Sequence, residues 1–544
     1  MGFANRIRLD FGIMTIAPKR IDATGLKALL AAGGELALLD VREERAFSEA
    51  HLLFAVSAPL SRLELVLADL VPRTGAPVVL CDADNGLSER AAAHMAGFGY
   101  TDIAVLDRGI AGWKDAGFEI FSGVSVPSKA FGEFVEEAYH TPSISAAELK
   151  AKLDAGEDLV ILDSRPFDEY HRMSIPRGID CPGAELVYRA ADLAPSPATT
   201  VVVNCAGRTR SIIGAQSLIN AGIPNKVIAL RNGTMGWELA GFTCERGQTR
   251  RAIGPVPGAV RTKAQEYAVR VARRFGVRTI DTATLRQWQT EADRRTLYVF
   301  DVRNPEEYAA GHLAGAVSAP GGQLVQATDQ YAGVRNARLV LTDDDGVRAT
   351  MTASWLIQMG WTDAVVLRGS PADLPIEHTV RPKRVLGLDR AQVDTIDAPT
   401  LKAWLDAGKA TVIDVATSRA YRAGHIPCAW FAVRSRLDTT LKKIPLGGTL
   451  VLTSEDGVLA QLAAAERGAK VLAGGTAAWA ADYPLATGPE RMADEPDDVW
   501  LKPYERNATA TDARAAMNEY LSWEVNLVQQ IARDGTARFH KFPH

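Results

Sequence analysis

Hydrophobic and polar positions follow two patterns that alternate along most of the chain. Short apolar segments, such as LVILD at 159–163 and VVVN at 201–204, are typical of buried parallel strands. Between them, segments such as SAAELKAKLDAG at 145–156 and RSIIGAQSLINAG at 210–222 place apolar residues at helical spacing. The SAAE sequence also predicts a capping box at a helix start. This alternation predicts an α/β fold in which a small parallel sheet carries helices on both faces.

The strand-and-helix pattern occurs four times in tandem. Each copy has a β-branched strand that ends in an aspartate, and these residues are Asp40, Asp163, Asp301 and Asp414. Three copies close with a glycine–tryptophan element, whereas residues 369–373 of the third copy read GSPAD. The repeats predict four domains, here called units one to four, at 15–120, 140–248, 277–372 and 393–488.

The remaining C-terminal segment, 489–544, is predicted to be a helical tail. A helix is expected near 508–533, with Met517, Leu521, Val525 and Val528 forming the face that packs on a domain. Nothing in the tail sequence predicts chemistry.

One loop carries residues suited to chemistry, and it lies in unit two. Cys205 follows an apolar strand and precedes a helical pattern, where loop N–H groups and the helix dipole stabilise a thiolate or an anion. Arg208 and Arg210 add two guanidinium groups that can hold oxyanions. Gly207 allows the backbone to curl without steric cost. We therefore expect a nucleophilic thiol of lowered pKa and an anionic substrate.

The repeat resembles the rhodanese (thiosulfate sulfurtransferase) domain, and Cys205–Ser211 resembles the Cys-x4-Arg-Ser persulfide loop of that family. The resemblance implies four tandem rhodanese-like domains and double displacement: the Cys205 thiolate takes a sulfane sulfur from an anionic donor such as thiosulfate, and cyanide, a thiol or a protein cysteine then removes it. It implies that the N–H groups of the loop hold the persulfide and that Asp163 and Arg165 brace the loop. The implied loop residues are Ala206, Gly207, Arg208, Thr209, Arg210 and Ser211.

Other functions remain open beside this one. The chain could be a persulfide carrier that delivers sulfur to a docked partner protein, a mercaptopyruvate sulfurtransferase, or an anion-binding regulator without turnover. Tyrosine phosphatases use a wider Cys-x5-Arg loop, so the tighter loop here favours a sulfur atom over a phosphoryl group.

The other three units lack the thiol at the equivalent position. The offset from the strand aspartate places Asp82, Asp343 and Ser454 there. Cys81 stands one residue early, on the opposite face of a strand, although a shift of one residue in the alignment would restore it. Cys181 is expected to be a small buried residue, with a resolving thiol as the alternative. Units one, three and four are therefore expected to be scaffold, with unit one forming a wall of the Cys205 cleft.

Charge and composition restrict the partners. Lysine and arginine number 61 against 65 acidic residues, a net charge of −4 that gives no general attraction to nucleic acid or to anionic membranes. The five cysteines are widely spaced, and the N-terminal stretch lacks the uninterrupted apolar segment of a secretory signal, so we expect a cytoplasmic protein. No metal-binding or nucleotide-binding motif is present, and we expect no cofactor.

Overall fold

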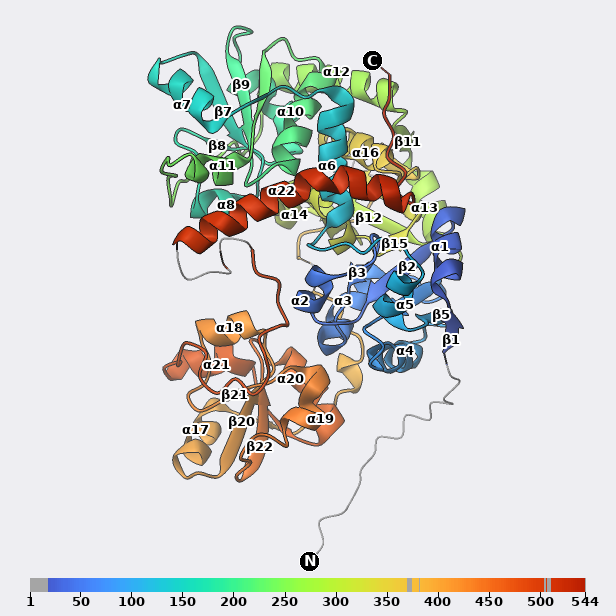
Figure 1. Ribbon diagram of the computed structural model, residues 1–544, viewed down its shortest axis with the longest axis vertical. Coiled ribbons are helices and arrows are strands. Elements are labelled where there is room, and N and C mark those ends of the chain that lie inside the picture. Colours follow the sequence, from blue (N-terminus) through green and yellow to red (C-terminus); the bar gives the residue numbers. More distant parts are fainter. Residues whose placement is uncertain (1–17, 369–373, 381, 503–504, 506–509, 544) are drawn as a thin grey trace, which may run out of the picture.

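The computed structural model describes residues 18–368, 374–380, 382–502, 505 and 510–543 (Figure 1). The GSPAD segment at 369–373 and the chain before residue 18 lie outside the described residues. Each repeat of the described chain forms a mainly parallel sheet with helices on both faces, which confirms the α/β fold of tandem units.

Unit two shows how the sequence builds this sheet. Its five strands are ordered β6-β10-β9-β7-β8 and all pairs are parallel. The strands are β6 (Ser143–Ile144), β7 (Leu159–Asp163), β8 (Ile179–Asp180), β9 (Thr200–Asn204) and β10 (Val227–Leu230). The helices are α7 (Ala146–Asp154), α8 (Phe167–Arg172), α9 (Glu185–Leu193), α10 (Thr209–Ala221) and α11 (Gly233–Leu239). Successive strand residues alternate between two cores: Val201 and Val203 face one, and Val202 faces the other.

Units one, three and four repeat the same strand order. Unit one contains β1 (Lys19–Ile21), α1 (Ala23–Ala32), β2 (Leu36–Asp40), α2 (Glu44–Glu49), β3 (Val56–Ser57), η1 (Leu60–Arg62), α3 (Leu63–Leu70), β4 (Val78–Cys81), α4 (Leu87–Gly97), β5 (Ile103–Leu106) and α5 (Gly109–Asp115). Unit three contains β11 (Arg278–Ile280), α13 (Thr282–Thr290), β12 (Leu297–Asp301), α14 (Pro305–Ala310), β13 (His312–Leu313), β14 (Val317–Ser318), α15 (Gly321–Gln326), η2 (Thr328–Gln330), β15 (Val334–Arg335), β16 (Arg338–Thr342), α16 (Val347–Gln358), β17 (Ala364–Leu367) and β18 (Ile376–Glu377). Unit four contains β19 (Thr395–Ile396), α17 (Ala398–Asp406), β20 (Ala410–Asp414), α18 (Ser418–Ala423), β21 (Trp430–Phe431), η5 (Arg434–Arg436), α19 (Leu437–Thr440), β22 (Thr449–Thr453), α20 (Val458–Arg467), β23 (Lys470–Leu472) and α21 (Gly475–Asp482).

Three further helices lie between the units or after them. Helix α6 (Val126–Tyr139) follows unit one and packs on α10, and α12 (Gly258–Phe275) packs on α9 and α16. Helix α22 (Ala510–Asp534) crosses unit two and α6, drawn in red in Figure 1. Within the described residues, no helix combines the length and apolar character that a membrane span requires.

The tail helix confirms the predicted element and most of its predicted face, with Val525 as the exception. Met517 and Leu521 are buried as expected, whereas Val525 is 50% exposed. The residue before it, Glu524, is buried instead, and Leu527 continues the packed face. The sequence did not predict this buried carboxylate.

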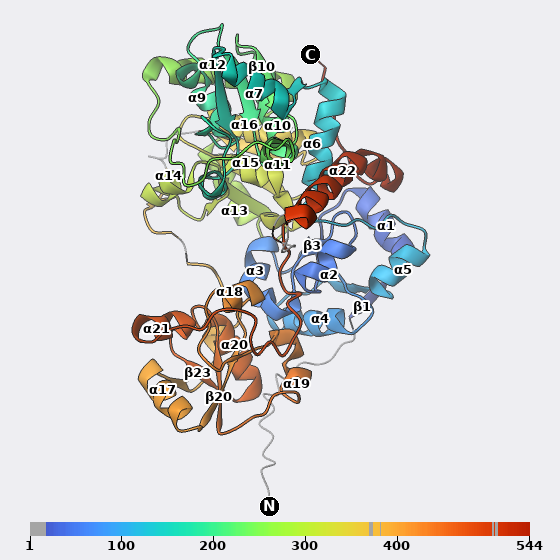
Figure 2. The same ribbon diagram turned by 60° about the vertical axis from the view of Figure 1, so that its left-hand side comes forward.

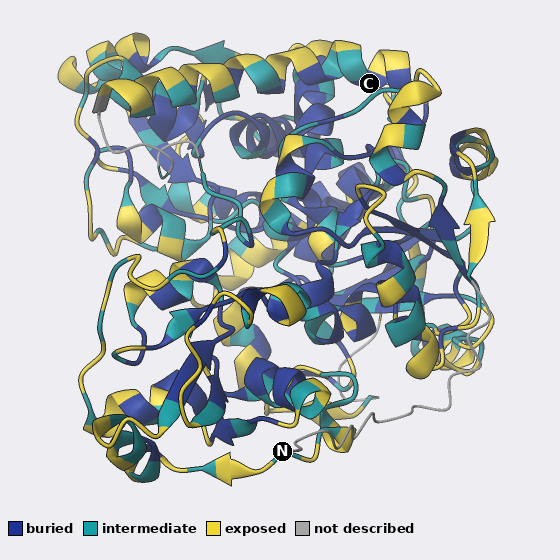
Figure 3. Ribbon diagram, turned by 60° about the horizontal axis from the view of Figure 1, so that its bottom comes forward, coloured by how far each residue is buried: buried dark blue, intermediate teal, exposed yellow. Residues whose placement is uncertain are grey.

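The units pack in a way that the chain order does not reveal. Strand β15 of unit three adds to the edge of the unit one sheet by antiparallel pairing with β2. Unit four lies beneath unit one (Figure 2), where Arg434 forms a buried ion pair with Glu64. Figure 3 shows dark blue strands inside the sheets, whereas some edge strands and the outer helix faces are in the yellow of exposed residues.

Candidate active site

Cys205 lies where β9 ends and the chain turns into α10. Its preceding residue, Asn204, is the last of the strand, and the helix begins at Thr209. The cysteine is 2% exposed, and its Sγ lies 3.5 Å from the Oγ of Ser211 in the first turn of the helix. The fold therefore brings the predicted loop Cys205–Ser211 to the carboxyl edge of the sheet, before a helix N-terminus.

Strand pairing fixes which residue of each repeat corresponds to Cys205. The strand aspartates pair with Cys81, Asn204, Thr342 and Thr453, each the last residue of its own strand. The next residues are therefore equivalent, and these are Asp82, Cys205, Asp343 and Ser454. Cys81 thus matches Asn204, so the alternative alignment that would make it a loop thiol is wrong.

The units without a thiol fill their own loops with an oxygen acceptor. The Asp82 carboxylate accepts the N–H of Ser88 at 2.9 Å, and Asp343 accepts the N–H of Ala349 at 3.0 Å. The corresponding N–H in unit two belongs to Ser211, because each donor stands six residues after its acceptor. The loop geometry is thus suited to a negatively charged group at this position, and only in unit two is that position occupied by sulfur.

Asp163 and Arg165 lie directly beneath the loop. The Asp163 carboxylate receives two hydrogen bonds from the guanidinium of Arg165, at 2.8 and 2.7 Å. It also accepts the side-chain N–H of Asn204 at 2.9 Å, and Asn204 is joined to Cys205. These buried contacts link the end of β7 to the base of the loop.

Both loop arginines are engaged by carboxylates. Arg208 donates to the two oxygens of Glu133 on α6, at 2.7 and 2.6 Å, and also contacts Glu136. Arg210 donates to both oxygens of Glu169 on α8, at 3.1 and 2.9 Å. The sequence predicted these guanidinium groups as free anion ligands, and the structure shows that each is held by an acid that the sequence did not single out.

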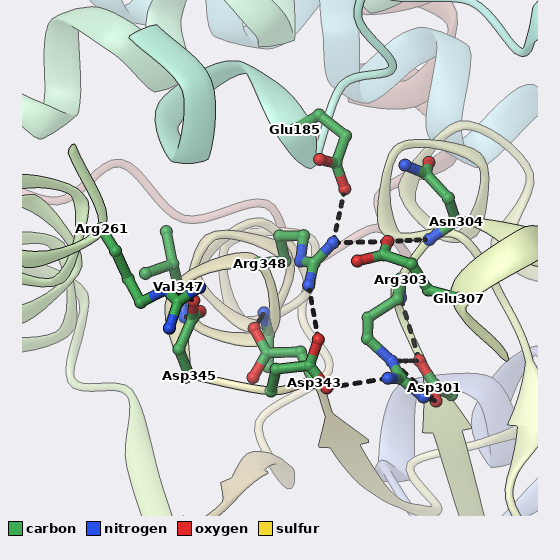
Figure 4. A network of polar contacts seen from close by, with 12 residues as sticks. Glu185, Arg261, Asp301, Arg303, Asn304, Glu307, Asp343, Asp345, Val347 and Arg348 are labelled. Carbon is green, nitrogen blue, oxygen red and sulfur yellow. Dashed lines mark hydrogen bonds and ion pairs between the residues drawn. The ribbon is translucent and has the colours of Figure 1, made fainter. Parts of the chain in front are cut away.

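Unit three, rather than unit one, provides the neighbouring unit that contacts Arg210. The guanidinium donates to the side-chain oxygen of Gln323 on α15 at 3.1 Å. The reverse contact exists as well: Arg348, the unit three equivalent of Arg210, bonds Glu307 of its own unit at 2.7 Å and Glu185 of unit two at 2.9 Å (Figure 4). Units two and three therefore exchange equivalent contacts. Unit three is therefore a neighbour of the site that the sequence did not predict, whereas the role of unit one as a wall of the Cys205 cleft stays a prediction.

Two segments outside the four units also contact the loop. A Cβ on Gly132 of α6 would lie 2.7 Å from Cγ2 of Thr209, so α6 approaches the loop as closely as a glycine permits. A Cβ on Gly207 would lie 3.3 Å from Oε2 of Glu524 on α22. The Thr209 hydroxyl also lies 3.5 Å from the other oxygen of Glu524. The tail, whose sequence predicted no chemistry, therefore contacts the loop.

These neighbours could have been found only in part from the sequence. Glu169 and Glu307 each stand six residues after their strand aspartates, so the repeat register marks the acid that pairs with the loop arginine. Tyr520 and Glu524 share a helix face because they are four residues apart, but no motif connects them to unit two.

The resting thiol is not the low-pKa group that the sequence predicted. Burial raises the pKa of Cys205 above its ordinary value, and the charge of Arg210 with hydrogen bonds from Ser211 opposes this effect only partly. The negative charge of Glu524 raises it further. Burial also raises the pKa of Cys81 and of Cys181 well above the ordinary value, so neither is activated.

Among the described residues, the one acid–histidine cluster with metal-like spacing lies away from this loop. It consists of Glu64, His94 and Glu466. Arg434 donates to both of these glutamates and already supplies their positive charge.

Comparison with known proteins gives a consistent picture. The sequence model of the rhodanese-like domain matches residues 22–116, 145–240, 281–372 and 397–482. The crystal structure of a thiosulfate sulfurtransferase from Pseudomonas aeruginosa is 50% identical, covers 96% of this chain and 100% of its own, and superposes with a TM-score of 0.92.

Two curated relatives each match about a fifth of the chain. A putative sulfur carrier protein of Bacillus subtilis is 32% identical over 102 residues, 19% of this chain and 54% of its own. An HTH-type transcriptional regulator of Mycobacterium tuberculosis is 32% identical over 105 residues, 19% of this chain and 45% of its own. The chain thus spans about half the length of these curated relatives.

Proposed function

Because this chain belongs to the rhodanese-like family, we propose that it is a thiosulfate sulfurtransferase that works through a persulfide on Cys205. The observation that carries the proposal is the difference between units at one loop position. A carboxylate occupies this position in units one and three, whereas the Cys205 thiol occupies it in unit two. The full-length similarity to a thiosulfate sulfurtransferase supports thiosulfate as the donor. A sulfur carrier would need the same thiol, but its relative matches only 19% of the chain.

The proposed reaction consists of two displacements at the same sulfur. The Cys205 thiolate attacks the outer sulfur of thiosulfate, a new S–S bond forms, the old S–S bond breaks, and sulfite leaves with the bonding electron pair. Cyanide or a thiol then attacks the outer sulfur of the persulfide, and the Cys205 thiolate leaves. The net reaction moves one neutral sulfur atom from donor to acceptor and needs no redox partner.

Each loop residue has a part in this proposal. The backbone from Ala206 to Ser211 binds the anionic persulfide, as its equivalents bind carboxylates in the other units. Arg210 supplies the positive charge that lowers the thiol pKa. Arg208 fixes the loop to α6 through Glu133. Asp163 and Arg165 hold the base of the loop.

The proposal includes the organisation of the chain and its setting. We assign domain boundaries at 15–120, 140–248, 277–372 and 393–488, with the tail at 489–544. The five cysteines are all unpaired, which supports a reducing, cytoplasmic setting. The physiological acceptor is a small thiol, cyanide or a protein cysteine.

The test is intact-protein mass spectrometry after incubation with thiosulfate and again after addition of cyanide. We expect a gain of one sulfur, about 32 Da, that maps to Cys205 and disappears with cyanide, and no gain in Cys205→Ser. Cys181→Ser is the matched control, because that buried thiol lies in the same unit, and it should load normally. An adduct on another cysteine would contradict the assignment, and loading without release to small acceptors would favour the carrier function.

A further inference from the structure

A buried lysine without an acceptor lies beside the Cys205 loop. Lys129 on α6 is 3% exposed, and its ammonium group has no hydrogen-bond or ion-pair partner among the described residues. Three aromatic rings surround it instead: its Nζ lies 5.6 Å from the ring centre of Trp500, 5.3 Å from that of Tyr520 and 5.0 Å from that of Trp523. Cation–π contacts of this kind stabilise the charge but leave its N–H donors free.

Further polar groups around this ammonium lack partners too. The indole N–H groups of Trp500 and Trp523 are buried and unpaired in the described part of the chain. Buried polar groups without partners are rare, and they are expected where a ligand binds. Two carboxylate oxygens whose charges act on Lys129, Glu524 Oε2 and Asp329 Oδ1, are buried and unpaired among the described residues as well. Lys129 is the cation of this group, and an oxyanion is the natural ligand for its free N–H donors.

Lys129 lies beside the loop that carries Cys205. Tyr520, which lies against Lys129, comes within 3.7 Å of the position that a Cβ on Gly207 would take. Gly132, one turn after Lys129 on α6, contacts Thr209. The charge of Arg210 acts on Lys129 and on the Cys205 thiol alike. The lysine and the thiol thus belong to one electrostatic cluster.

The loop arginines do not compete for the role of free cation. Arg208 and Arg210 are already engaged in ion pairs with Glu133 and Glu169, as described above. We propose that Lys129 binds the SO3 group of the sulfur donor while Cys205 attacks its outer sulfur. The inference rests on the proposed function and names a donor-binding cation that the loop itself does not supply.

Several titratable groups face Lys129 and set its pH dependence. They are Glu524 and Tyr520 on α22, Asp329 on η2, Arg210 on α10 and His51 of unit one. Burial lowers the pKa of Lys129 to about 8, and burial raises the pKa of Glu524 to about 7. As the pH rises from 6 to 9, the site gains a negative charge on Glu524 and loses the positive charge of Lys129. Both changes weaken anion binding.

The test compares two alkylating reagents of similar size that differ by one charge. The ratio of the rates at which iodoacetate and iodoacetamide modify Cys205, read by peptide mass mapping, reports the local potential. It does so because the thiolate fraction affects both reagents equally. We expect Lys129→Met to lower this ratio about tenfold and to lower kcat/KM for thiosulfate about tenfold to a hundredfold, the value of one charge-assisted contact. Lys129→Arg should keep the ratio near that of the unmodified chain.

Lys27→Met is the matched control. Lys27 also lies over two aromatic rings, Trp113 and Phe118, and it pairs with Asp534 at the end of α22. It therefore controls for the loss of a cation–π contact and for loosening of α22, and the ratio should not change. The proposal is overturned if Lys129→Met leaves the ratio unchanged, whether the two alkylation rates stay the same or fall equally.

A second measurement needs no variant and separates the two proposals. In the unmodified chain, the iodoacetate-to-iodoacetamide ratio at Cys205 should fall as the pH rises from 6 to 9, and a flat ratio overturns the anion site even if Lys129→Met does not fold. If the ratio falls but thiosulfate adds no sulfur, the anion site stands and the proposed function fails. If thiosulfate adds sulfur to Cys205 but the ratio is flat, the proposed function stands and the anion site fails.

Discussion

Arg210 combines a structural and a chemical role, and two variants can separate them. Burial raises the pKa of Glu169, but the charge of Arg210 and its hydrogen bonds outweigh burial, so the pKa lies at about 2 against 4.5 for a free glutamate. Each tenfold change in proton affinity is worth about 1.4 kcal/mol, so beside Arg210 the ionised form of Glu169 makes the fold about 3 kcal/mol more stable at pH 7 than its protonated form would. Because the folded pKa is the lower one, this stabilisation is complete above about pH 4.5 and is lost as the pH falls toward 2.

Arg210→Met leaves the Glu169 carboxylate without this counter-ion, whereas Glu169→Gln/Arg210→Met removes both charges. The single variant should lose about 3 kcal/mol and the double variant less than about 1 kcal/mol, because breaking a buried pair costs far more than replacing it. Four units need not unfold in one step, so the loss is measured locally. Hydrogen–deuterium exchange of the α8 and α10 amides should accelerate about a hundredfold in the single variant alone.

The chemical role should not recover in the double variant. Arg210 lowers the pKa of Cys205, and without its charge a smaller fraction of the thiol is ionised. Persulfide formation from thiosulfate, followed by rapid quench and mass spectrometry, should therefore be slower by about tenfold or more in both variants. If the double variant regained both slow exchange and normal loading, Arg210 would serve only to neutralise Glu169, and the reasoning would be refuted.

Two further predictions concern packing and buried charge. Gly132→Ala should slow persulfide formation by about tenfold or more, because its Cβ would lie 2.7 Å from Thr209. Gly97→Ala is the control: its Cβ would have nothing within 4 Å, and persulfide formation should be unchanged. Equal rates in the two variants would show that α6 does not fix the loop. Burial raises the pKa of Asp414 to about 7, and this unit lacks the arginine that follows the strand aspartate by two residues elsewhere. Because the pKa is higher in the folded state than in the unfolded state, Asp414 lowers stability as the pH rises from about 4 to 7. Asp414→Asn should therefore raise the calorimetric unfolding temperature of unit four by about 5 °C at pH 8, and this gain should vanish near pH 4. The same change at Asp163, which pairs with an arginine, should lower stability, and a uniform gain at all pH values would argue against this explanation.

The fold and the loop could be predicted from the sequence because both are local. A parallel strand ends at the same edge of the sheet in every repeat, so fixed offsets from the strand aspartates locate the loop in each unit. The loop residues are consecutive, from Cys205 to Ser211, and the strand pairing places them as the offsets require. The same offsets identify Asp82 and Asp343 as the residues that replace the thiol.

The surroundings of the loop could not be predicted because they come from distant segments. Thr209 and Glu524 are 315 residues apart in sequence, and Arg210 and Gln323 are 113 apart. Hydrophobic periodicity assigned Val525 to the packed face of the tail helix, yet Glu524 occupies it. A periodicity argument places apolar residues inside by construction, and so it misses a carboxylate that is buried for the sake of the site.

The exchange of contacts between units two and three explains why an inactive unit keeps part of the loop. Unit three has no thiol, yet it keeps Arg348, whose guanidinium is fully buried and bonds Glu185 across the interface (Figure 4). Arg210 makes the corresponding contact in the opposite direction, to Gln323. An arginine at this position therefore joins the two units whether or not it also serves a thiol. Units one and four have leucines there and join each other through Arg434 and Glu64 instead. It follows that the loop arginine of unit three is retained by the interface, and that its presence is no evidence of a second catalytic site.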